Sequence, residues 1–209
     1  MTHVFDKLLA TEYPALDPRV QSALVSPPEH VFEVKSVGDG FALVKDDLPW
    51  ETAPGAWFPK LGIKSWQESG RLQILQTGQP VRPWIDRVLA TPTDAQRLAA
   101  RAWTETGRPL RLFLAAYVDF SQISEVRFFA SREGCRYVSH VTRGSGGESV
   151  GPLRREMQAY AVEVASRVPL DSVIVDVALT GAGLRLVDVN PGLTPADIED
   201  LRSAVAAPA

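Results

Sequence analysis

The segment from residue 171 to residue 192, DSVIVDVALTGAGLRLVDVNPG, limits the fold more than any other part of this sequence. It contains two runs rich in β-branched and apolar residues, and the runs alternate with the period of a strand. The glycine-rich residues 181–183 between them predict a tight turn. The two runs are therefore expected to form an antiparallel hairpin, and the fold must include an antiparallel sheet.

Similar signals predict further strands and helices along the chain. They lie at residues 30–50 and 125–141 (hairpins), 111–118 (a strand), and 91–107, 151–168 and 194–207 (helices). Two helices have clear start signals, because Thr93 and Gln96 form a capping-box pattern and Thr194 precedes Pro195 as an N-cap. Residues 72–91 are expected to be irregular. Antiparallel strands mixed with helices in this order predict an α+β architecture.

Length and charge exclude several classes of protein. The chain has 209 residues, enough for one large or two small domains, and a net charge of −3 with interspersed acids and bases. A nucleic-acid-binding protein would normally show a basic stripe, so we expect no nucleic-acid partner. No apolar run reaches the roughly 18 residues of a membrane span, and the N-terminus does not resemble a signal peptide. With Cys135 as its single cysteine, the protein is expected to be cytoplasmic, without membrane contact.

The last hairpin is expected to set two aspartates against each other. A three-residue loop at residues 181–183 would pair Thr180 with Leu184, and this register places Asp176 directly opposite Asp188. The prediction depends on the length of the loop, because a four-residue loop would break the pairing.

Asn190 is expected on the same face as the two aspartates, because side chains on a strand alternate with period two. Ile174 and Leu186 would be their apolar neighbours. Two facing carboxylates repel each other unless a proton or a cation lies between them. Carboxylate and amide oxygens suit Mg²⁺, so Asp176, Asp188 and Asn190 are candidate metal ligands. The alternative is an ordinary turn with solvated aspartates.

Three stretches resemble blocks of the cell division cycle protein 123 family, a group of ATP-grasp proteins. They are the hairpin VIVDVALTGAGLRLVDVNP, the stretch FPKLGIKSW at residues 58–66, and the stretch LRLFLAAYVDFSQISEVRFFASREGCRYVSH at residues 110–140. The blocks occur in the family's order and together span about residues 57–192. The resemblance implies an α+β, ATP-grasp-type fold with lobes at residues 1–113 and 114–209, and Mg-ATP between them.

The resemblance also implies a role for each matching residue. Lys60 and Arg127 match a lysine and an arginine that contact ATP phosphates, and they are the candidate catalytic residues. Residues 114–118 match the hinge that meets adenine through its backbone, and Asp119 would lie near the ribose. The candidate cofactor-binding residues are Lys60, Leu114, Ala116, Tyr117, Val118, Asp119 and Arg127. The residues that match magnesium ligands are Asp176, Asp188 and Asn190.

Simpler interpretations of the two cations stay open. Lys60 lies in an aromatic-rich segment and could extend along apolar surface without contacting any ligand. Arg127 could pair with Glu125 or Glu133 within an exposed hairpin. Each cation alone is therefore weak support for a phosphate site, and the ordered blocks carry the prediction.

Three functions are compatible with the resemblance. The main expectation is a ligase that phosphorylates a carboxylate with ATP and lets an amine or thiol attack the acyl phosphate; its substrate, a small molecule or a protein, is unknown. The alternative is an assembly factor or chaperone that binds ATP without turnover, since the family's eukaryotic members act in assembling translation initiation factor 2. A degenerate scaffold without nucleotide is the third. It is favoured by Ala115 and Ala116, which replace an Arg-Lys pair of the family's hinge.

Overall fold

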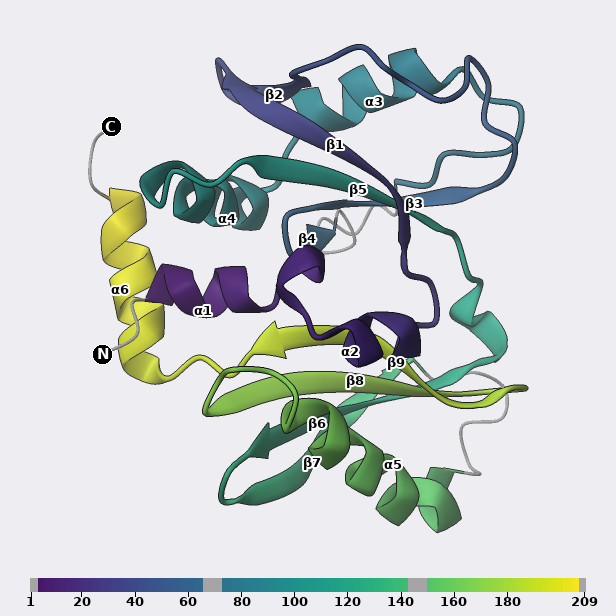
Figure 1. Cartoon of the computed structure of the whole chain (residues 1–209), viewed down its shortest axis with the longest axis vertical. Helices are drawn as coiled ribbons and strands as arrows, with labels where there is room; N and C mark the ends of the chain where they lie inside the picture. Colours follow the sequence, from purple (N-terminus) through teal and green to yellow (C-terminus); the bar gives the residue numbers. More distant parts are fainter. Residues whose placement is uncertain (1–3, 66–72, 143–149, 207–209) are drawn as a thin grey trace. The chain divides into compact units, whose positions relative to one another are not determined.

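The structure is a computed structural model that describes residues 4–65, 73–142 and 150–206. Within these ranges the chain forms two antiparallel sheets and six α-helices, as Figure 1 shows. The α+β architecture predicted from the sequence is therefore confirmed. The glycine-rich loop at residues 143–149 lies outside the described residues.

Internal contacts divide the chain into two compact units. One unit consists of Ser26–Tyr117, and we call it the lysine unit because it contains Lys60. The other consists of Met1–Val25 together with Val118–Ala209, and we call it the hairpin unit. The boundary after residue 117 lies near the expected lobe boundary after residue 113, whereas the first 25 residues group with the C-terminal part of the chain.

The lysine unit contains a five-stranded antiparallel sheet with the strand order β2-β1-β5-β3-β4. Its elements are β1 (Pro28–Val37), β2 (Gly40–Leu43), β3 (Trp57–Leu61), β4 (Lys64–Ser65), α3 (Val81–Ala90), α4 (Asp94–Glu105) and β5 (Leu110–Ala116). The predicted capping box between Thr93 and Gln96 starts α4. Strand β5, predicted from the sequence, pairs with a neighbour on each side, and its residues 110 and 112–114 are buried.

Helix α3 corrects the expectation that residues 72–91 are irregular. Its buried residues follow the spacing of one helical face and are Val81, Trp84, Ile85, Val88 and Leu89. Pro80 precedes the helix and Pro83 lies in its first turn, where a missing N–H removes no intrahelical hydrogen bond. The prolines therefore lie at the start of this helix, although proline in a sequence usually argues against a helix.

The hairpin unit contains a four-stranded antiparallel sheet with the strand order β7-β6-β8-β9. Its elements are α1 (Val4–Ala10), η1 (Tyr13–Ala15), α2 (Pro18–Ala23), η3 (Phe120–Gln122), β6 (Ser124–Ser131), β7 (Gly134–Thr142), α5 (Val150–Ala165), β8 (Ser172–Thr180), β9 (Gly183–Pro191) and α6 (Pro195–Ala206). Helix α5 packs against one face of this sheet (Figure 1), where Met157 and Ala161 join Val126, Phe128 and Val175 in a buried cluster. The opposite face of the sheet carries polar side chains, among them Arg127 and Asp176.

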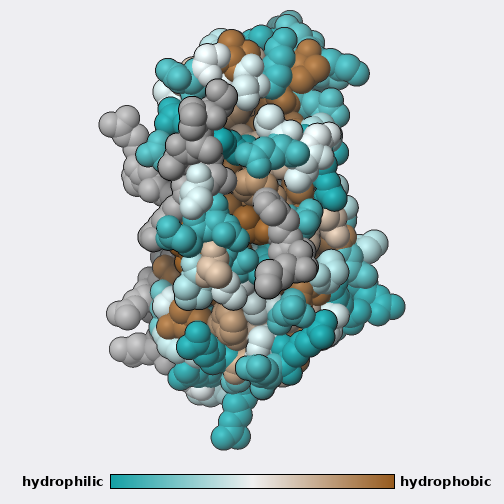
Figure 2. Space-filling model, turned by 90° about the vertical axis from the view of Figure 1, so that its left-hand side faces the viewer, coloured by the Kyte–Doolittle hydropathy of each residue, from teal (hydrophilic) through white to brown (hydrophobic). Residues whose placement is uncertain are grey.

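The helices of the described ranges do not have the length and apolar character of membrane spans. Figure 2 shows hydrophilic residues interspersed with apolar ones on the face that it presents. Scattered apolar residues of this kind are normal on protein surfaces and do not by themselves indicate a partner.

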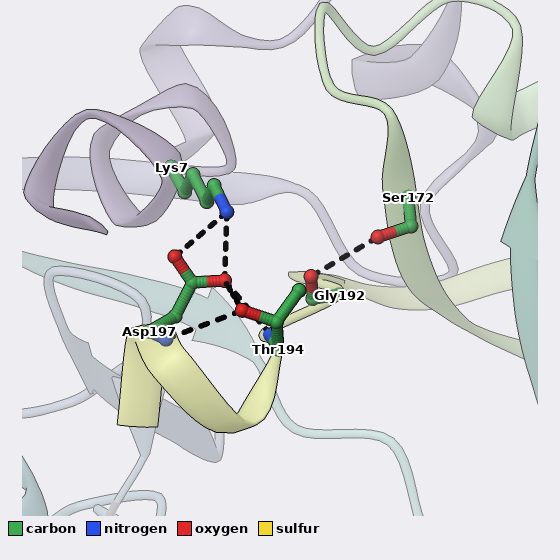
Figure 3. Close-up of polar contacts among 5 residues, drawn as sticks. All are labelled: Lys7, Ser172, Gly192, Thr194 and Asp197. Atoms are coloured by element: carbon green, nitrogen blue, oxygen red, sulfur yellow. Dashed lines mark hydrogen bonds and ion pairs between the residues drawn. The ribbon is translucent and has the colours of Figure 1, made fainter. Parts of the chain in front are cut away.

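The start of α6 is held by a group of polar contacts (Figure 3). Thr194 is the predicted N-cap, and its Oγ1 accepts a hydrogen bond of 3.2 Å from the backbone N–H of Asp197. The Asp197 carboxylate accepts from the Thr194 backbone N–H at 2.8 Å and from Lys7 Nζ at 2.7 Å. The N-terminal helix α1 is thereby tied to the first turn of α6 within the hairpin unit.

Gly192, at the end of β9, makes a close backbone approach to Ser172. Ser172 Oγ donates a hydrogen bond of 3.0 Å to the Gly192 carbonyl (Figure 3), and the Gly192 N–H donates to the Ser172 carbonyl at 2.9 Å. A Cβ at position 192 would lie 2.4 Å from Ser172 Oγ and 2.9 Å from the Ser172 carbonyl carbon. Glycine is therefore needed at position 192, because a larger residue would collide with Ser172.

Gly192→Ala is expected to lower the free energy of unfolding by about 1–2 kcal/mol, because the added methyl group overpacks this contact. Urea denaturation of wild type and variant measures the difference. Gly181→Ala is the matched control, since a Cβ there meets nothing within 4 Å and the φ angle is not positive. Equal midpoints for the two variants would contradict the prediction.

Candidate functional site

The predicted pairing of Asp176 with Asp188 is confirmed. The two residues are directly opposite in the register between β8 and β9, and Asn190 lies opposite Ile174 on the same face. The three oxygen-bearing side chains therefore come from one face of one hairpin. Ile174 is the apolar neighbour that the sequence predicted.

The turn that produces this pairing differs from the prediction. Thr180 pairs with Gly183, not with Leu184, so the loop has only residues 181 and 182. Gly183 has a positive φ of 96°, a conformation that glycine adopts readily. A shift of register between Asp176 and Val177 then restores the expected aspartate pair.

This shift is a β-bulge at Val187. It places Leu186 on the face of the sheet opposite to the one that the sequence predicted. Leu186 pairs with Val177 and Val189 pairs with Val175, and all four belong to the buried cluster under α5. The sequence suggested that Leu186 is a neighbour of the aspartates. This was wrong, because Leu186 is a core residue. In a regular strand without the bulge, Asp188 would share a face with Leu186 and point into the core.

Arg127 stands next to the aspartate pair in the same row of the sheet. It is directly opposite Asp176 in the register between β6 and β8, so the row reads Arg127, Asp176, Asp188 across three strands. The guanidinium donates from Nε to Asp176 Oδ1 and from Nη2 to Asp176 Oδ2, each at 2.7 Å. Such a two-pronged contact is the strongest geometry for an arginine and a carboxylate.

The Arg127–Asp176 contact answers the question left open for this arginine. The sequence offered Glu125 or Glu133 as a partner, and the structure pairs the guanidinium with Asp176. The Asp176 side chain is 3% exposed and that of Arg127 is 39% exposed. The hydrogen bonds to Asp176 raise the pKa of Arg127 above its ordinary value, and burial opposes this only in part. The arginine is therefore a permanent cation beside a buried carboxylate.

The second aspartate is held by its own strand. Asp188 Oδ1 accepts from the Val189 N–H at 3.0 Å, and Asp188 Oδ2 accepts from Asn190 Nδ2 at 3.1 Å. Both Asp188 and Asn190 are half-buried. Asp188 and Asn190 are thus oriented by contacts within their own strand.

The donor set of this row fits Mg²⁺ by its chemistry. It offers carboxylate oxygens from Asp176 and Asp188 and an amide oxygen from Asn190, which are the ligand types that hard divalent cations take. The row contains two carboxylates and one guanidinium, so these three side chains together have a negative charge that a cation would reduce. Among the residues that the structure describes, no group of three or more His, Cys, Asp or Glu side chains could hold a metal. Any magnesium site here therefore depends on the amide and on ligand oxygens.

Glu125, which the sequence offered only as a possible partner of Arg127, is a further polar residue of this face. It lies on the same face of β6 as Arg127, opposite Ala178 of β8, and is 7% exposed. Its charge also acts on the Arg127 guanidinium and raises the pKa of that group. Side chains alternate along a strand, which puts Glu125 and Arg127 on one face, but this alternation does not predict the burial of the glutamate.

The remaining candidates divide between the two units. Lys60, Leu114, Ala116 and Tyr117 belong to the lysine unit, whereas Val118 and Asp119 begin the second part of the hairpin unit. Lys60 is half-buried on β3, where it pairs with Phe113 of β5 and Ser65 of β4.

Residues 114–118, to which the resemblance assigned an adenine contact, already use part of their backbone. The Tyr117 N–H donates to the Ala56 carbonyl at 2.9 Å, and the Ser26 hydroxyl donates to the Ala116 carbonyl at 2.5 Å. Leu114 lies in the central strand of its sheet and is fully buried. An adenine contact in this segment would therefore need a backbone group other than these two.

Asp119 has a local structural role. Its Oδ1 accepts from the Ser121 N–H at 2.8 Å and its Oδ2 accepts from the Ser121 hydroxyl at 3.0 Å, so it caps the short helix η3. The residue is exposed. This contact orients the carboxylate and leaves its ribose role a prediction.

Comparison with known proteins gives a similarity in fold. No protein-family model matches the sequence, and no curated protein matches it. The solved structure of Cdc123 from Schizosaccharomyces pombe matches with a TM-score of 0.63 and 13% identity, over 97% of this chain and 95% of that chain. C-terminally truncated Cdc123 from the same organism matches with a TM-score of 0.57 and 13% identity, over 93% and 91%. The chain therefore has a Cdc123-like fold.

Proposed function

We propose that this chain binds ATP with Mg²⁺ and acts as an assembly factor for a protein partner. The observation that carries the proposal is the row of Arg127, Asp176 and Asp188 across β6, β8 and β9, with Asn190 beside it. A guanidinium next to two carboxylates is an arrangement that can receive a metal and a phosphate together.

In this proposal each residue of the row has one task. Asp176, Asp188 and Asn190 would hold the metal through their oxygens, and Arg127 would contact phosphate oxygens with its planar fork. A bound Mg²⁺ would neutralise part of the triphosphate charge. Lys60 is proposed as a second phosphate cation, and residues 114–118 together with Asp119 as the nucleoside side of the site; both assignments rest on the family resemblance.

The fold supports an assembly factor over the ligase that the resemblance also allowed. Similarity to Cdc123 extends over nearly the whole of both chains, and the family that the sequence resembles acts in assembling translation initiation factor 2. Ala115 and Ala116 stand where that family has two cations, which reduces the positive charge available for phosphoryl transfer. We therefore place nucleotide binding, without phosphorylation of a carboxylate, at the centre of the function. A cytoplasmic location is part of the proposal.

Calorimetric titration tests the proposal. We expect wild-type protein to bind Mg-ADP and a non-hydrolysable ATP analogue, and binding to weaken when EDTA removes the metal. We expect no ADP release above background from ATP with a panel of carboxylates and amines. No heat at millimolar nucleotide would refute nucleotide binding, and carboxylate-dependent ADP release would restore the ligase.

Asp188→Ala is expected to weaken Mg-ADP binding by at least about tenfold, because it removes a ligand of the proposed metal. Asp188 is half-buried and its carboxylate is held by its own strand, so the fold should tolerate the change. Asp171→Ala is the control, since Asp171 is an 87% exposed acid of the same unit. Titration isotherms that coincide for the two variants would remove Asp188 from the site.

A further inference from the structure

The geometry points to a competition between Arg127 and a divalent cation for Asp176, in which the phosphate of a nucleotide releases the carboxylate by taking over the guanidinium. This inference rests on the proposed function and concerns its regulation. It assigns Arg127 two successive partners, a carboxylate in the nucleotide-free protein and a phosphate in the complex.

The first observation is that both oxygens of Asp176 are in contact with Arg127. Nε and Nη2 each lie 2.7 Å from a different carboxylate oxygen, so a metal that binds this carboxylate meets the guanidinium at either oxygen. The guanidinium is a cation that already contacts both oxygens, so its repulsion opposes a metal cation at the same carboxylate.

The second observation is the difference in exposure between the two partners. The Asp176 side chain is 3% exposed and has little room to move, whereas the Arg127 side chain is 39% exposed. Arginine also has a long, flexible side chain whose planar fork fits phosphate as well as carboxylate. Arg127 is therefore the partner that can leave the ion pair. Phosphate oxygens that approach from the solvent are acceptors that its guanidinium binds well.

The third observation is the charge that remains after the guanidinium leaves. Asp188 lies directly opposite Asp176, and Glu125 lies on the same face of the sheet with 7% exposure. Movement of Arg127 to a phosphate would make this row of side chains more negative, and a bound cation would offset that change. Departure of the arginine and arrival of the metal are therefore coupled, and each favours the other.

Binding of Mn²⁺ alone, followed by electron paramagnetic resonance on nucleotide-free protein, tests the competition. Mn²⁺ prefers the same oxygen ligands as Mg²⁺ and is spectroscopically visible. Because a bidentate, charge-assisted ion pair no longer opposes the metal, we expect Arg127→Gln to bind Mn²⁺ roughly tenfold more tightly than wild type. The same variant should bind Mg-ADP more weakly than wild type, since it has lost a phosphate contact.

Two further variants complete the experiment. Arg127→Lys keeps the positive charge without the fork, so its Mn²⁺ affinity should lie between those of wild type and Arg127→Gln; it also serves if the glutamine variant does not fold. Arg132→Gln removes an 85% exposed arginine from the β6–β7 hairpin and should change neither affinity.

The outcomes separate this inference from the proposed function. Opposite changes in Arg127→Gln, tighter for Mn²⁺ and weaker for Mg-ADP, support the competition. Unchanged or weaker Mn²⁺ binding overturns it, and the proposed function stands if wild type still binds Mg-ADP. If wild type binds no nucleotide, the proposed function fails and so does the release by phosphate, whatever Mn²⁺ does.

Discussion

Arg127→Met is expected to lower the free energy of unfolding by about 2–3 kcal/mol, because it removes the guanidinium that contacts both oxygens of the buried Asp176 carboxylate. The figure lies below the range for fully buried pairs, since the Arg127 side chain is 39% exposed and water screens it. Urea denaturation of the nucleotide-free protein at neutral pH measures the change.

A double-mutant cycle identifies the cause of this loss. Arg127→Met combined with Asp176→Leu should be more stable than Arg127→Met alone, because the second change removes the buried carboxylate that has lost its contact with Arg127. Arg132→Met, which breaks an ion pair with the exposed Asp171, should cost less than about 0.5 kcal/mol. Equal losses for Arg127→Met and Arg132→Met would show that the buried pair is not important for stability.

The local parts of the fold were predictable from the sequence. Hairpins at their glycine turns, the capping box of Thr93 and Gln96, and the N-cap Thr194 all depend on residues close together in the chain. The confirmed pairing of Asp176 with Asp188 belongs to the same class, because a hairpin brings neighbours in sequence together. The prediction of this pair was correct, although the loop length on which it rested was wrong.

The β-bulge is visible in the sequence of β9, and it explains why the aspartate pair was correct despite the wrong loop length. Apolar residues of β9 fall at Leu184 and Leu186 and then at Val187 and Val189, so the alternation changes phase between residues 186 and 187. A regular strand cannot keep Leu186 and Val189 on one face, and both are buried in one cluster. The phase change therefore predicts an extra residue, which compensates for the short turn.

The ion pair between Arg127 and Asp176 could not be predicted in this way. It depends on the neighbouring positions of β6 and β8, which are separated in the chain by β7 and α5. No local pattern gives the order of strands in a sheet, so the sequence offered only nearby glutamates as partners of the arginine. The resemblance to a known family placed both residues in one site but gave no contact between them.

Asp197→Ala is expected to lower the free energy of unfolding by about 3 kcal/mol, because it breaks an ion pair and an N-terminal cap together. Lys7 Nζ lies 2.7 Å from both oxygens of the carboxylate, and the side chains are 24% and 10% exposed. Denaturation of Asp200→Ala is the control, since Asp200 is an exposed acid of the same helix. A loss no greater than the control's would mean that α1 is held by its apolar face alone.

The same carboxylate should make the stability depend on pH. Burial by itself would raise the pKa of Asp197, but hydrogen bonds from Lys7 and Thr194 outweigh it and hold this pKa below its usual value. A lowered pKa in the folded state stabilises the protein above the pKa of the unfolded chain, about 4, and this contribution is lost as the pH falls through the folded value. Wild type should therefore lose its stability advantage over Asp197→Asn between neutral pH and pH values below about 4. If the difference between the two proteins were the same at pH 3 and pH 7, the charge of Asp197 would have no part in holding α1 to α6.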